Sequence, residues 1–212
     1  MSAEVKICGL TDEDAIDAAI DAGADYLGLV FFAKSPRFVT PDRAAELTQF
    51  VEGVDKVGLF VDAEDAFLEE ALTHLRLDLL QFHGAETPER IDAIRREFAV
   101  PVMKVIAIGS AEDLAKAEPY FAVADRLLFD AKPPKNSDLP GGNAVSFDWS
   151  ILSGYKCPLQ WMLAGGLTAD NVAEAIRISG ARAVDVSSGV ESAPGVKDAA
   201  KIAAFIKAAK GT

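Results

Sequence analysis

The chain has little that would support a disulfide framework, a secretion signal or a membrane span. It contains two cysteines, Cys8 and Cys157, so a fold held together by disulfides is excluded. The first residues contain no apolar segment of the kind that a secretory signal needs. The uninterrupted apolar runs fall well short of the roughly 20 residues that a membrane-spanning helix requires. From these absences we expect a soluble cytoplasmic protein in a reducing compartment, with no membrane partner.

Basic residues are also scarce relative to acidic ones. Lysine and arginine together number 21, aspartate and glutamate number 33, and the net charge is −12. A surface this acidic repels phosphate backbones, so we expect no nucleic-acid partner. What the chain does have is an ordinary globular balance, because 50% of its 212 residues are hydrophobic and 25% are charged.

Short apolar runs rich in β-forming residues recur along the chain, and an amphipathic or alanine-rich segment follows most of them. The predicted strands are Val5–Cys8, Tyr26–Val30, Lys56–Val61, Leu77–Phe82, Val102–Ile106, Arg126–Asp130, Leu159–Leu163 and Ala183–Ser187. Threonines are predicted to begin helices after several of these strands, at Thr11, Thr40, Thr87 and Thr168.

Strands separated by helices pair in parallel. Eight such units, each of about 26 residues, predict an α/β fold consisting of a closed (β/α)8 TIM barrel. We expect one domain over residues 1–212. A doubly wound open sheet is the competing architecture, but its flavodoxin-like version needs only about five strands. The number of strands therefore favours the barrel.

Polar residues collect where the predicted strands end, which is the catalytic face of such a barrel. Cys8 lies on the same side of its strand as Lys6 and just before a helix N-terminus, so it points into the barrel mouth. A helix dipole and nearby cations lower the pKa of a thiol from about 8.5, which suits a base or a nucleophile. The alternative is a small buried apolar side chain, which is the role we assign to Cys157.

Asp130 ends a strand whose other residues are apolar. Partial desolvation raises the pKa of such a carboxyl and suits it to act as an acid. The alternative roles are a helix cap or a salt bridge to Lys132 or Lys104. Asp185 lies inside the eighth strand, which adjoins the first strand in a closed barrel, so we predict a buried ion pair between Asp185 and Lys6.

Two glycine- and serine-containing loops follow the seventh and eighth predicted strands. They are Gly165-Gly166 and Ser187-Ser188-Gly189. TIM barrels often bind phosphate with the backbone N–H groups of these two loops. A tight turn is the alternative explanation for either loop alone, but their joint occurrence favours a phosphate site.

Arg37 lies in the loop after the second strand, where an arginine can bind a carboxylate with two parallel hydrogen bonds. Taken alone, however, it reads more simply as a solvated surface arginine. His83 ends the fourth predicted strand. Its role could be that of a ligand, a substrate contact or a polar group whose hydrogen bonds are satisfied within the protein. Because no spacing of His and Cys matches a metal site and no GxGxxG or Walker motif occurs, we expect neither a metal nor a cofactor.

Together these junctions resemble the phosphoribosylanthranilate isomerase family of tryptophan biosynthesis. The matching segments, in family order, are Val5–Thr11, Lys34–Arg37, Val57–Val61, Leu80–Gly84, Leu128–Asp130, Phe147–Trp149, Leu163–Leu167 and Val184–Glu191. One departure is the run Gly141-Gly142-Asn143-Ala144, where the family usually carries a Gly-Gly-Thr-Gly type sequence.

The resemblance implies an aldose–ketose rearrangement of N-(5-phosphoribosyl)anthranilate. In that family pattern Asp130 acts as the general acid, Cys8 acts as the general base and Arg37 holds the anthranilate carboxylate. The two glycine-containing loops hold the phosphate. Gln81, His83 and Asp185 are further expected substrate contacts. Two alternatives stay open at this point: another phosphosugar enzyme, such as an epimerase or a thiamin-phosphate-type synthase, and a regulatory barrel that binds a phosphate ligand without turnover.

Overall fold

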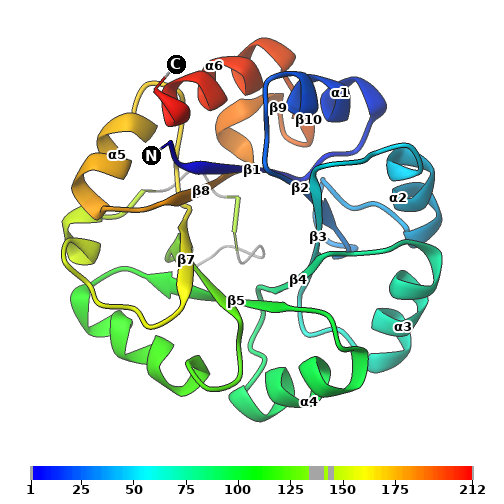
Figure 1. The fold of residues 1–212 in the computed structure, drawn as a ribbon, viewed down its shortest axis with the longest axis horizontal. Helices are drawn as coiled ribbons and strands as arrows, with labels where there is room; N and C mark the ends of the chain where they lie inside the picture. Colours follow the sequence, from blue (N-terminus) through cyan, green and yellow to red (C-terminus); the bar gives the residue numbers. More distant parts are fainter. Residues whose placement is uncertain (1, 134–140, 143–145, 212) are drawn as a thin grey trace.

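A computed structural model describes residues 2–133, 141–142 and 146–211. It contains a closed ring of eight parallel strands in sequence order, viewed down its axis in Figure 1. The strands are β1 (Glu4–Cys8), β2 (Tyr26–Val30), β3 (Asp55–Phe60), β4 (Leu79–Phe82), β5 (Val102–Ile108), β6 (Arg126–Ala131), β7 (Gln160–Leu163) and β8 (Ala183–Val186). The ring closes where β8 pairs with β1, with Asp185 opposite Lys6.

Helices surround this ring on its outer side (Figure 1). The α-helices are α1 (Glu13–Asp21), α2 (Pro41–Thr48), α3 (Asp65–His74), α4 (Pro88–Phe98), α5 (Val172–Ser179) and α6 (Ala199–Lys210). Three segments are 3-10 helices: η1 (Ala111–Tyr120), η2 (Trp149–Leu152) and η3 (Ser188–Val190). A short antiparallel hairpin of β9 (Glu191–Ala193) and β10 (Val196–Lys197) precedes α6. Among the residues described, no helix is both long and apolar enough to cross a membrane.

The predicted barrel is confirmed, and each of the eight predicted strands lies within two residues of an observed one. The doubly wound alternative is wrong because β8 returns to β1. Thr40 and Thr87 cap α2 and α4 as predicted.

The two other predicted helix starts are wrong. Asp12, and not Thr11, caps α1, because its carboxylate accepts a hydrogen bond from the Ala15 N–H. The helix expected to open at Thr168 begins at Val172. The Asn171 side chain accepts a hydrogen bond from the Thr168 N–H and closes a turn ahead of the helix.

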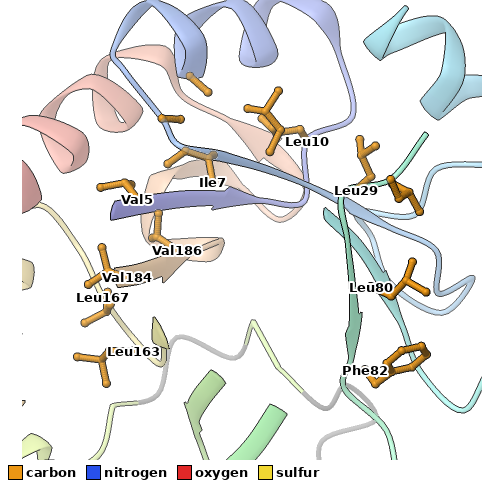
Figure 2. Close-up of a cluster of buried hydrophobic side chains, with 14 of the residues drawn as sticks. Val5, Ile7, Leu10, Leu29, Leu80, Phe82, Leu163, Leu167, Val184 and Val186 are labelled. Atoms are coloured by element: carbon orange, nitrogen blue, oxygen red, sulfur yellow. The ribbon is translucent and has the colours of Figure 1, made fainter. Parts of the chain in front are cut away.

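Alternate residues of each strand belong to two apolar layers, as the period of two in a strand requires. One layer lies between strands and helices, and Figure 2 shows Val5, Ile7, Val184 and Val186 within it. The other layer fills the ring and includes the following residues: Tyr26, Val57, Leu79, Met103, Val105, Leu128, Met162, Ala164 and Ala183. Nearer the carboxyl ends of the strands, the inward positions are mixed: Cys8, Val30 and Leu59 form a small apolar cluster, and polar side chains such as Asp130 face them across the mouth. The packed interior forms the floor of this mouth.

Candidate active site

A cavity that opens to solvent occupies the mouth of the barrel at the carboxyl ends of the strands. Every residue that the sequence singled out for catalysis or binding contributes to its wall. They are Cys8, Arg37, Gln81, His83, Asp130, Gly165, Gly166, Asp185, Ser187, Ser188 and Gly189.

Cys8 ends β1 and is 4% exposed, with its side chain on the cavity wall. The predicted ion pair beneath it is confirmed, since Lys6 Nζ lies 2.9 Å from Asp185 Oδ1. The predicted direction of the thiol pKa is wrong. Burial raises the pKa of Cys8, and although the Lys6 ammonium opposes this effect, the Asp185 carboxylate adds to it. Burial inside the ring therefore outweighs the neighbouring cations.

Asp130 is the next-to-last residue of β6, and its carboxylate contacts the ring of His83. His83 Nε2 lies 3.4 Å from Asp130 Oδ2, while Oδ1 accepts a hydrogen bond from the Ala131 N–H. The alternative salt bridges are wrong, because Lys104 pairs with Glu86 and, within the described ranges, Lys132 Nζ lies 3.9 Å from Asp113 Oδ1. Lys104 alternates with the inward-facing Met103 and Val105 of β5, so its side chain points away from the ring interior. Asp130 is thus free of a direct lysine contact among the residues that the structure describes.

Gln81 lies on β4 below His83 and is 1% exposed. Its side-chain oxygen is buried, and no partner for it occurs within the described parts of the chain. A buried polar oxygen without a hydrogen bond costs free energy, and such groups concentrate at functional sites. Gln81 is therefore suited to accept a hydrogen bond from a ligand hydroxyl or amine in the cavity.

The loop that carries His83 is held from behind by Glu86. One Glu86 oxygen accepts hydrogen bonds from the backbone N–H groups of Asp62 and Gly84, and Lys104 Nζ lies 2.8 Å from the other. Asp62 has a left-handed backbone conformation, with φ of 48°, that this bond helps to hold. The loops after β3 and β4 are thereby joined on the outer side of the ring, which fixes the position of His83.

Arg37 is 6% exposed, so the expectation of a solvated surface arginine is wrong. Its Nε and Nη2 atoms donate to the two carboxylate oxygens of Glu191 at 2.6 and 2.8 Å. Lys197 Nζ lies 2.9 Å from Glu191 Oε1. Burial alone would raise the pKa of Glu191, but the bonds from Arg37 and Lys197 hold it below its ordinary value.

Sequence reasoning assigned no role to Glu191 or Lys197. Both are charged residues in the hairpin that follows β8, Glu191 in β9 and Lys197 in β10. Lys197 also donates to the backbone oxygen of Ser187 at 2.9 Å. The buried cluster of Arg37, Glu191 and Lys197 therefore joins the loop after β2 to the loop after β8.

The two predicted phosphate loops lie against each other. A side chain at Gly189 would overlap the carbonyl oxygen of Leu167, so only glycine allows this approach. Gly166 is held in turn by Asn171, whose side-chain nitrogen donates to the Gly166 carbonyl at 3.0 Å. The backbone of both loops thus lines one side of the cavity, as the sequence predicted, with glycines that let an anion come close.

The structure describes only part of the segment Gly141-Gly142-Asn143-Ala144, where the sequence departs from the family pattern. Gly141 lies beside His83 and Asp130, and Gly142 lies beside the Arg37 guanidinium. Asn143 and Ala144 lie outside the described residues. Within the described ranges, no group of three or more His, Cys, Asp or Glu side chains could hold a metal ion. Cys157 lies away from the mouth, beside a second hollow at the opposite end of the ring.

Comparison with known proteins shows the family to which the chain belongs. The model of the family described as N-(5'-phosphoribosyl)anthranilate isomerase matches residues 5–208. The chain belongs to this isomerase family. The enzyme of that name from Paramagnetospirillum magneticum is 72% identical over 100% of this chain and 99% of its own length. The enzyme from Rhodospirillum rubrum is 56% identical, with 97% of each chain covered.

Solved structures of phosphoribosylanthranilate isomerases have the same architecture. The Thermotoga maritima enzyme superposes with a TM-score of 0.89 at 34% identity, covering 99% of this chain and all of that one. A second structure, with a TM-score of 0.87 at 33% identity and the same coverage, holds reduced 1-(o-carboxyphenylamino)-1-deoxyribulose 5-phosphate. The family resemblance of the sequence is confirmed, and the epimerase and synthase alternatives are set aside.

Proposed function

We propose that this chain isomerises N-(5'-phosphoribosyl)anthranilate, with Cys8 as the general base and Asp130 as the general acid. The observation that carries the assignment is that both side chains line one cavity from separate sides of the ring, at the ends of β1 and β6. An aldose–ketose rearrangement needs one acid and one base on either side of the sugar.

The reaction begins at the ring oxygen of the ribose. Asp130 donates a proton to this oxygen as the C1'–O bond breaks, and the nitrogen lone pair forms a C1'=N bond. Cys8 then removes the proton from C2', and the electron pair moves toward nitrogen to give an enolamine. Proton transfer back to C1' and loss of the C2' hydroxyl proton yield the ketone. No oxidant or reductant is consumed, because carbons 1' and 2' exchange oxidation levels.

The other groups of the cavity bind the two anionic ends of the substrate. The backbone of Gly165-Gly166 and Ser187–Gly189 binds the phosphate, which lets a protein of net charge −12 hold a dianion. Arg37 binds the anthranilate carboxylate. Glu191 takes the Nε–H group and one N–H group of Nη2, which leaves the two N–H groups of Nη1 and the second of Nη2 to bind the carboxylate. Gln81, His83 and Asp185 contact the atoms between these ends.

A fluorescence assay tests the activity directly. Anthranilate ribosides fluoresce differently from their rearranged product, so the purified chain should remove the substrate signal at a rate proportional to enzyme concentration. The gene should also restore growth without tryptophan to a strain that lacks this isomerase. A purified, folded chain that leaves the substrate signal unchanged would refute the proposed activity.

Arg37→Ala tests the assignment of the carboxylate site. We expect inhibition by a product analogue with the carboxylate to weaken about 10-fold or more, because a hydrogen bond to a charged group contributes about 1.5–3 kcal/mol. An analogue with an unsubstituted phenyl ring should lose much less. Lys197 still pairs with Glu191 in this variant, so no lone charge is left buried.

The matched control is Arg177→Ala, which removes an exposed arginine from α5. Its inhibition constants for both analogues should stay at the wild-type values. If Arg37→Ala weakens inhibition by the two analogues equally, Arg37 does not bind the carboxylate.

A further inference from the structure

Lys6 is a buried cation for which the proposed reaction has no direct use. It lies on β1 below Cys8 and is 0% exposed. Its Nζ atom donates to Asp185 Oδ1 at 2.9 Å, and Lys6 is not among the residues that line the cavity. A lysine in this position cannot touch the substrate, so any effect on the reaction must pass through its neighbours.

A glycine on the adjacent strand brings this ammonium close to the thiol. Gly28 of β2 is opposite Cys8 in the sheet register. A Cβ at Gly28 would lie 2.9 Å from Cys8 Sγ and 3.1 Å from Lys6 Nζ, so both atoms occupy the space that a side chain would need. Measured from that shared point, Sγ and Nζ are within about 6.0 Å of each other, the sum of the two distances. Opposite charges at such a separation favour each other's ionised form.

The charged groups around the thiol come from three strands. Lys6 on β1 and Lys197 on β10 favour the thiolate, and Asp185 on β8 opposes it. The β2 neighbour is uncharged, and Arg37, His83 and Asp130 line the same cavity. Of the charges that favour the thiolate, Lys6 has the largest effect, and the Cys8 sulfur in turn raises the pKa of Lys6.

Asp185 shares the ammonium with the sulfur. A lysine ammonium has three N–H donors, and among the described residues one hydrogen bond from Nζ goes to Asp185. The remaining donors have the Cys8 sulfur as a neighbour. Burial lowers the pKa of Lys6, but the Asp185 carboxylate and the Cys8 sulfur together raise it above its ordinary value, so the buried lysine stays charged.

We infer that Lys6 is a positioning residue whose ammonium stabilises Cys8 as the thiolate base, with Asp185 holding that ammonium in place and limiting its effect. The inference rests on the proposed role of Cys8. It assigns to the buried pair a chemical task in addition to its structural one, since the base for the C2' proton must be ionised before it can act.

The test compares Asp185→Asn with the double variant Lys6→Met/Asp185→Asn. Both lack the carboxylate, so they differ at residue 6 alone, and in Asp185→Asn the Cys8 thiolate is the remaining anion that favours the Lys6 ammonium. Replacing both members of a buried pair by neutral groups of similar size leaves no lone charge inside the ring. The readout is the rate of alkylation of Cys8 by iodoacetamide as a function of pH, followed by peptide mass. Cys157 of the same molecule is the internal control, because it lies beside the hollow at the opposite end of the ring.

We expect the midpoint pH for alkylation of Cys8 to be about 1–3 pH units higher in the double variant than in Asp185→Asn, as removal of a nearby cation requires. The midpoint for Cys157 should be the same in both proteins. Lys6→Arg, which retains the charge, should keep the Cys8 midpoint near that of the wild type. If Lys6→Met/Asp185→Asn does not fold, Lys6→Gln with the same Asp185→Asn change makes the same comparison.

Equal Cys8 midpoints with and without the ammonium would overturn the inference. Its failure can be distinguished from failure of the proposed function, because alkylation does not depend on turnover. A shifted Cys8 midpoint, with no matching shift in the acid limb of kcat/KM for the same pair of variants, would support the effect of Lys6 on the thiol and remove Cys8 as the base.

Discussion

Cys8→Ala is expected to lower kcat by at least about 100-fold while KM stays within a few-fold of the wild-type value, the usual range for loss of an acid–base group. The thiol contacts the C2' proton in the proposed reaction and contributes little to holding the phosphate or the carboxylate. The alanine is small and apolar, so it fits the buried position at the end of β1 without leaving a charge unpaired.

The pH dependence of the wild-type enzyme gives a second check on the same residue. Burial raises the pKa of Cys8 above its ordinary value, so the thiolate is a minor species at neutral pH and its fraction increases as pH rises toward that raised pKa. The value of kcat/KM should therefore rise with pH above neutrality, as the base ionises. Cys157→Ala is the matched control and should leave both kcat and this profile unchanged. Near-normal turnover by Cys8→Ala would remove the thiol from the mechanism.

Asp130→Asn is expected to lower kcat about 100-fold or more, because the amide cannot donate the proton that opens the ribose ring. The side chain keeps its size, and its oxygen can still accept the hydrogen bond from the Ala131 N–H. Stability and substrate affinity should therefore change little. Steady-state kinetics and urea unfolding, measured on the same preparation, separate the two effects.

Asp17→Asn, an exposed change on α1, controls for the loss of one negative charge. It should retain full activity. Wild-type turnover by Asp130→Asn would show that another group, such as His83 at 3.4 Å from the carboxylate, opens the ring. A substrate already supplied in the ring-opened form would then be the next comparison, since it bypasses the acid step.

The strand pattern was predictable because it depends on local periodicity. Short apolar runs at regular spacing, such as Tyr26–Val30, were recognised with the bounds that the structure has for β2. The catalytic face followed from the same reasoning, since the ends of parallel strands meet at one edge of a barrel. The adjacency of β1 and β8 even allowed the pair of Lys6 with Asp185 to be foreseen.

The burial and pairing of Arg37, Glu191 and Lys197 could not be predicted from local sequence patterns. Arg37 and Glu191 are 154 positions apart, and nothing local marks either as buried. Their pairing depends on how the hairpin after β8 folds back over the loop after β2. The predicted direction of the Cys8 pKa was wrong for a related reason. A helix terminus and a lysine can be recognised in the sequence, but the depth of burial that outweighs their effect cannot.

The order of strands and helices, the barrel and the residues at its mouth were determined by the sequence itself, because each depends on periodicity and on the ends of local elements. The tertiary structure decided which charges neutralise one another and how far each is removed from water. Those two quantities control the ionisation of Cys8 and the orientation of Arg37, and both depend on distances between segments that lie far apart along the chain.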